Sequence, residues 1–155
     1  MKDTLRLLFE MYHGDSKKAS EEAEERIIAI CKPIIKKFYR IASSFSLRIS
    51  PFDGDYIPRR GYFTSISISP NEKEIYLEYH DSCMGDSIDD TIVMPVDWII
   101  DTENQLKLFF EKCKEKKTKD LMNNINNQYK EIERLKGLYR EMNDMEFSNI
   151  NFLDK

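Results

Sequence analysis

The sequence is poor in cysteine, glycine and proline, and it contains no long apolar run. Its 3 cysteines, Cys31, Cys83 and Cys113, are widely spaced and form no CxxC pair, which is typical of a reducing compartment. Only 5 glycines and 5 prolines occur among 155 residues, of which 41% are hydrophobic, and this balance indicates a folded, helix-rich domain. Because no segment approaches the ~20 apolar residues of a membrane span and no secretory pattern begins the chain, we expect a cytoplasmic protein without a membrane partner.

An excess of positive charge is also missing. The chain has 24 Lys and Arg against 28 Asp and Glu, a formal net charge of -4, so it creates no overall field that would attract nucleic acid. We therefore expect no binding to duplex DNA. The phosphate-binding motifs GxxxxGK[ST] and GxGxxG are absent, as are the close Cys or His pairs of zinc sites. The sequence thus predicts no cofactor and no metal site.

The first third of the chain has apolar residues at helical spacing. Leu5, Leu8, Phe9 and Tyr12 fall on one face of a short predicted helix that ends near Gly14.

A second helix is predicted to begin at Ser20, whose hydroxyl can cap it. Proline inside a helix removes one hydrogen bond, so Pro33 predicts a kink or a break near Lys32. The apolar stripe of this helix comprises Ile27, Cys31, Ile34, Phe38, Ile41 and Phe45.

The middle of the chain has the period of two that is typical of strands. Four segments, 46–50, 62–69, 74–80 and 91–96, alternate apolar and polar residues. In the second segment Thr64, Ile66 and Ile68 are predicted to share the apolar face, and residues 69–74 have the composition of a hairpin loop.

These segments together predict an α+β fold. In the predicted core domain, residues 1–100, N-terminal helices pack on a small antiparallel sheet of about four strands. A long C-terminal helical arm over 101–146 and a tail over 147–155 follow.

The arm has heptad spacing that is typical of a coiled coil, with one polar position at Gln128. Two interpretations stay open: the seam joins copies into a dimer or higher oligomer, or the arm folds back as an intramolecular helical hairpin. The apolar residues of this seam are Leu121, Ile125, Ile132, Leu135, Tyr139 and Met142.

The stretch "EYHDSCMGDSIDD", residues 78–90, concentrates groups that could carry chemistry. One His and one Cys are too few for a zinc site, and neighbouring strand residues point to opposite faces. We therefore interpret His80 and Cys83 as hairpin residues, with Gly85 and Asp86 in the turn, and expect no enzyme. A nucleophilic Cys83 with His80 as its base is the alternative. Residues 81–103 contain seven acids and no Lys or Arg, which predicts a solvated acidic rim or a patch for a basic partner.

The segment "DYIPRRGYF", residues 55–63, is the candidate ligand site. Arg59 and Arg60 lie between Tyr56 and Tyr62. Arginine can bind phosphate with two hydrogen bonds and tyrosine can stack on a base, so the segment predicts a site for a nucleotide or another anionic ligand. The alternative is a surface loop whose arginines pair with the acidic rim.

The order of these parts resembles a group of known proteins. A short sheet ending in "TIVMPVDWIID", a charged helix and a C-terminal "NQYKEIERLKGLYREM" resemble small uncharacterised proteins of bacteriophages and prophages, over roughly residues 60–142. The resemblance implies an accessory protein of the host cytoplasm, among which are counter-defence factors. Two non-enzymatic functions follow: the protein sequesters a nucleotide or another anionic ligand through the arginine segment, or it is an inhibitor or adaptor that binds a host protein through the arm and the acidic rim.

Overall fold

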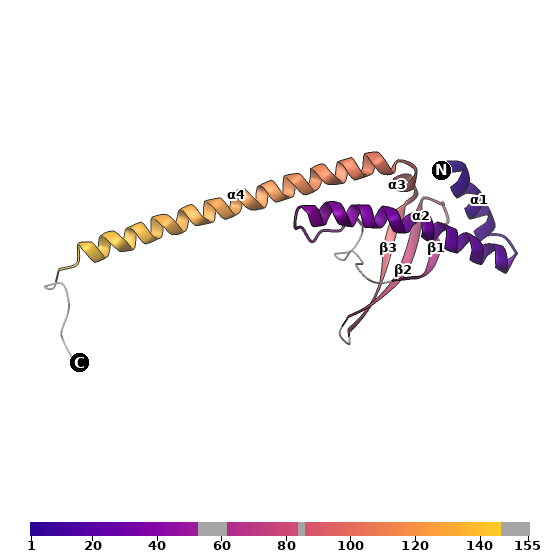
Figure 1. Cartoon of the computed structure of the whole chain (residues 1–155), viewed down its shortest axis with the longest axis horizontal. Helices are drawn as coiled ribbons and strands as arrows, with labels where there is room; N and C mark the ends of the chain where they lie inside the picture. Colours follow the sequence, from indigo (N-terminus) through magenta and orange to yellow (C-terminus); the bar gives the residue numbers. More distant parts are fainter. Residues whose placement is uncertain (53–61, 84–85, 147–155) are drawn as a thin grey trace. The chain divides into compact units, whose positions relative to one another are not determined.

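The computed structural model describes residues 1–52, 62–83 and 86–146, and it has the predicted α+β composition (Figure 1). The chain forms two compact units, residues 1–114 and 115–155. The elements in chain order are α1 (Lys2–Tyr12), α2 (Lys17–Ser44), β1 (Tyr62–Ile68), β2 (Glu74–Cys83), β3 (Asp86–Pro95), α3 (Val96–Ile100) and α4 (Thr102–Asn143).

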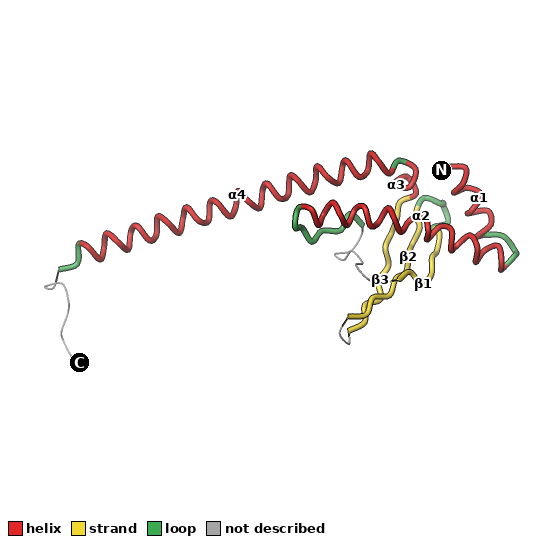
Figure 2. Tube along the Cα trace, viewed as in Figure 1, coloured by secondary structure: helices red, strands yellow, loops and turns green. Residues whose placement is uncertain are grey.

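The sheet within the described residues has three strands rather than about four. Its order is β1-β2-β3 and both pairs are antiparallel (Figure 2). The predicted strand over 46–50 is wrong, because the chain there closes the end of α2. The backbone of Ser46 has the left-handed helical conformation, with a φ of 54°. The Ser46 N–H donates to the Ser43 carbonyl, and the Leu47 N–H donates to the Ala42 carbonyl. This is a Schellman ending, so these N–H groups are already used and join no sheet.

The hairpin between β1 and β2 is confirmed, but β1 contains a bulge. The pairing shifts between Phe63 and Ser65, so Thr64 is exposed rather than on the apolar face as predicted. Phe63 takes the place on the core side, and its ring lies 6.5 Å from that of Tyr79. An extra residue in one strand reverses which residues face the core, and this explains the wrong prediction for Thr64.

The helices keep their predicted apolar faces but differ at two positions. The N-cap of α2 is Ser16, whose side-chain oxygen accepts the N–H of Ala19 at 3.3 Å. The predicted cap, Ser20, instead donates its hydroxyl to the Tyr12 carbonyl at 3.0 Å and so ties α2 to α1.

Pro33 does not break α2, which continues as one helix to Ser44. The carbonyl that loses its donor belongs to Ala29. Ala29 and Pro33 are both exposed, so water can satisfy that carbonyl and the helix continues at a reduced cost.

The core lies between α2 and one face of the sheet, and an aromatic cluster closes one end of it. In Figure 1, α2 lies across the strands and α1 packs beside it. Phe38 is fully buried, and its ring lies 5.2–5.6 Å from the rings of Phe52, Trp98 and Phe109. Because Phe109 and Cys113 are buried as well, the first turns of α4 belong to the core unit.

The outer edge of β1 is held by side chains from both N-terminal helices. The Ile66 N–H donates to Glu24 Oε1 at 3.0 Å, and the Tyr12 hydroxyl donates to the Ile66 carbonyl at 3.0 Å. Burial, and secondarily the Glu24 carboxylate, raise the pKa of Tyr12, so its hydroxyl stays a donor. These two bonds occupy edge groups that would otherwise be open to pairing with another strand.

We predict that Tyr12→Phe lowers the free energy of unfolding by about 1 kcal/mol, because it removes one hydrogen bond and leaves the Ile66 carbonyl unpaired. Urea unfolding followed by circular dichroism measures this loss. Tyr129→Phe, which removes an exposed hydroxyl from α4, is the control and should change the value by less than ~0.5 kcal/mol. Equal effects of the two substitutions would contradict a role for Tyr12 at the edge.

Candidate binding surfaces

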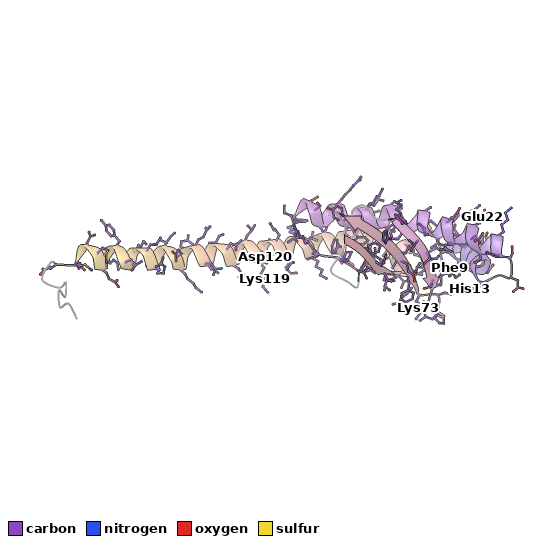
Figure 3. All side chains as sticks on the ribbon, turned by 90° about the horizontal axis from the view of Figure 1, so that it is seen from below. Phe9, His13, Glu22, Lys73, Lys119 and Asp120 are labelled. Atoms are coloured by element: carbon purple, nitrogen blue, oxygen red, sulfur yellow. The ribbon has the colours of Figure 1, made fainter. Side chains whose placement is uncertain are left out.

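The face of the sheet that points away from α2, here called the open face, consists mainly of polar and aromatic side chains. In Figure 3 the sheet lies in front of α2, so this face is turned to the viewer. The strand pairing arranges its residues in three rows across the sheet. The rows are Tyr62, His80 and Asp89; Ser65, Glu78 and Thr91; and Ser67, Tyr76 and Val93.

The first row is the most exposed and carries a histidine–carboxylate pair. His80 Nδ1 lies 2.6 Å from Asp89 Oδ1, and the two side chains are 29% and 79% exposed. The Tyr62 ring is 5.6 Å from the His80 ring, and Tyr62 is 60% exposed. The carboxylate orients the imidazole, so this row presents two rings and one acid in a fixed arrangement.

Carboxylates are held in place on the rest of the open face as well. The Ser65 hydroxyl donates to Glu78 Oε2 at 2.5 Å, and the Tyr76 hydroxyl donates to Glu74 Oε2 at 2.9 Å. The bond to Glu74 raises the pKa of Tyr76. None of the three strands contains Lys or Arg, so the open face is acidic.

The structure describes only one of the four predicted ligand residues. Tyr56, Arg59 and Arg60 lie outside the described residues, whereas Tyr62 is the first residue of β1. Sequence reasoning missed the contact of Tyr62 with His80. A hairpin extended without a bulge from the pair Ile68↔Ile75 would place residue 81 opposite Tyr62, and the bulge brings His80 there instead.

The alternative with Cys83 as nucleophile gains no geometric support. Cys83 is the last residue of β2 and pairs in the ladder with Asp86, and its side chain is outside the part of the structure that is described. Asp86 begins β3 and is not in the turn as predicted, because the antiparallel ladder continues to that residue.

The two other cysteines are inert by burial. Desolvation raises the pKa of Cys31 to about 12 and also raises that of Cys113. Both side chains are fully buried. Among the side chains that the structure describes, no three of His, Cys, Asp or Glu lie close enough to hold a metal ion.

A shallow hollow of about 300 Å³ lies between the end of α2 and the beginning of α4. Ile41, Leu106 and Phe110 form its apolar floor. Lys107 and Glu103, which also line it, pair with each other at 2.8 Å. Ligand pockets combine apolar walls with polar groups that are available to the ligand, and this hollow offers few of them.

The second unit presents the heptad seam as an exposed surface. α4 runs without interruption to Asn143, so residues 102–143 form no helical hairpin. In Figure 3, side chains stand out from α4 on all sides beyond the labelled Lys119 and Asp120. The six predicted seam residues, Leu121, Ile125, Ile132, Leu135, Tyr139 and Met142, are 43–69% exposed.

No helix among the described residues has the length and apolarity needed to cross a membrane.

Comparison with known proteins adds no identification. No family model matches the chain, and searches of curated proteins and of solved structures likewise found no significant match.

We predict that the Cys83→Ser variant contains no thiol that reacts rapidly with a maleimide under native conditions. The reagent requires an accessible thiolate, and burial denies this to Cys31 and Cys113. Mass spectrometry of the labelled protein, with urea-unfolded protein as the control, measures the reaction. Rapid native labelling of the variant would show that the core around these two cysteines opens readily.

Proposed function

We propose that the protein is a non-enzymatic binding protein whose open face holds a basic segment of a partner protein. The observation that carries the proposal is the ordered array of carboxylates and aromatic rings on a sheet face that lacks Lys and Arg. A lysine or arginine from the partner could pair with Glu78 or Asp89 and lie against the Tyr62 ring.

The physical properties of this face suit recognition more than catalysis. Its acids are tied to neighbours in the sheet, so the side chains lose little further freedom when a partner binds. An exposed acidic surface speeds the approach of a basic partner, and salt weakens this attraction.

Sequestration of an anionic ligand is the second candidate. Tyr62 supports it, because its ring is largely exposed directly after the sequence Arg59-Arg60-Gly61. Glu78 and Asp89 oppose it, because carboxylates on the same face repel phosphate. The resemblance to phage accessory proteins fits either candidate, since counter-defence factors act on host proteins or on nucleotide signals.

We expect Arg- and Lys-rich peptides, and not nucleotides, to bind the protein in calorimetric titrations. Glu78→Gln with Asp89→Asn should weaken peptide binding by about tenfold, since two exposed ion pairs of up to ~1 kcal/mol each are lost. The matched control is Glu22→Gln with Glu25→Gln, which removes the same charge from the exposed surface of α2 and should change affinity far less.

A different result in the same titrations would favour the second candidate. If cyclic or linear nucleotides bind and Arg59→Ala with Arg60→Ala abolishes that binding, the protein sequesters anions and the basic-partner proposal is wrong. Peptide binding that is insensitive to both pairs of substitutions would remove the open face as the site.

A further inference from the structure

We propose that residues 121–142 of α4 pair with the same residues of a second copy as a parallel, in-register, two-stranded coiled coil. The pairing surface is the exposed heptad seam of the second unit. The occupant is a second copy of this chain, and four features of the seam support that choice.

The first feature is the placement of branched side chains. A heptad with Ile125 and Ile132 at position a puts Leu121 and Leu135 at position d. β-branched residues at a with leucine at d favour parallel dimers over trimers and tetramers.

The second feature is the polar residue in the seam, Gln128, which occupies position d and is exposed in the single chain. In a parallel, in-register pair it faces its own copy, and the two amides can each donate to and accept from the other. In antiparallel pairings Gln128 faces a position a residue instead, which is Ile125, Ile132 or Tyr139. The parallel pair therefore satisfies the amide by symmetry, and a polar layer of this kind sets register.

The third feature is the charge at the flanking positions. In the same heptad Glu131 is at g and Lys136 is at e, and a parallel pair brings Glu131 of one copy beside Lys136 of the other. Within one chain Glu131 bonds to Arg134 at 2.7 and 2.8 Å and Lys136 pairs with Glu133 at 2.8 Å. In the pair, Glu131 and Lys136 can exchange these intra-chain partners for the oppositely charged residue of the other copy.

The fourth feature is the weak intrinsic helicity of the segment. Asn123, Asn124, Asn126 and Asn127 are poor helix formers, and Gly137 is worse. All the side chains over 121–136 are exposed, so packing against the described residues of the single chain does not compensate. Pairing along the seam supplies the missing stabilisation, because helices in proteins depend mainly on burial of an apolar face.

The seam also has a defined beginning. One heptad earlier the a and d positions are Thr118 and Lys114, which are polar. The pairing surface therefore begins at Leu121, inside the second unit, and ends at Met142.

Sedimentation of the full chain tests the association. Wild type should be a dimer at micromolar concentration, and Ile132→Asp should raise the dissociation constant at least tenfold, because it places a charge in the seam. Asn127→Asp adds the same charge at an exposed position off the seam and should leave the dimer intact. A monomeric wild type, or equal effects of the two variants, would overturn the proposal.

Cross-linking tests the orientation. In the Cys83→Ser background, Leu121→Cys and Tyr139→Cys should each form an inter-chain disulfide with itself under mild oxidation, because a parallel pair brings identical residues together, whereas the antiparallel register with Gln128 opposite Ile132 places residue 121 opposite residue 139. An antiparallel pair would cross-link only a mixture of the two variants, and that result would refute the parallel arrangement.

Gln128→Leu tests the polar layer. The substitution should tighten association about tenfold or more and admit antiparallel or larger assemblies, because the constraint on register is lost. Weaker association of Gln128→Leu would show that the amide stabilises the pair, and would contradict its role as a specificity device.

Discussion

The core unit depends on the ring contacts of one residue, Phe38. It is fully buried near the middle of the second half of α2, and its ring touches Phe52, Trp98 and Phe109. These partners come from the segment after α2, from α3 and from α4, so one side chain joins residues as far apart in sequence as Phe38 and Phe109. Edge-to-face and stacked rings stabilise such a cluster beyond the area that they bury. The sheet can then leave its other face open, because the burial needed for stability is provided on one side.

The sequence was sufficient for elements whose signals are local. The apolar stripe through Ile27 and Phe38 predicts the buried face of α2, and residues 69–74 predict the hairpin, because helical period and turn composition need no distant partner. Thr64 shows the limit of prediction from such local signals. Its exposure depends on a bulge, and the edge beside it is fixed by Glu24, which is 42 residues away from Ile66. Contacts of that range leave no periodic trace in the strand itself.

The two candidate surfaces, the heptad seam and the open face, also differ in how far the sequence alone predicts them. The heptad seam follows from spacing alone, and the structure adds that the seam side chains are exposed in the part of the chain that it describes. The open face does not follow from spacing, since Tyr62, His80 and Asp89 come together only through the register of three strands. The acidic character of residues 81–103 could be read directly from composition, whereas the pairing of Asp89 with His80 could not.

The proposed binding by the open face and the proposed coiled coil fit together, because a dimer has two binding faces instead of one. A single acidic face in water binds a basic segment weakly, because exposed ion pairs contribute ~1 kcal/mol or less each. A parallel coiled coil through residues 121–142 gives each assembly two open faces. A partner with two basic segments then binds the second face at an effective concentration that the connection between the faces sets, and avidity can exceed either single affinity by about 10² or more. Loss of the seam would therefore weaken binding to a divalent partner without altering any residue of the open face, while binding to a single peptide would stay unchanged.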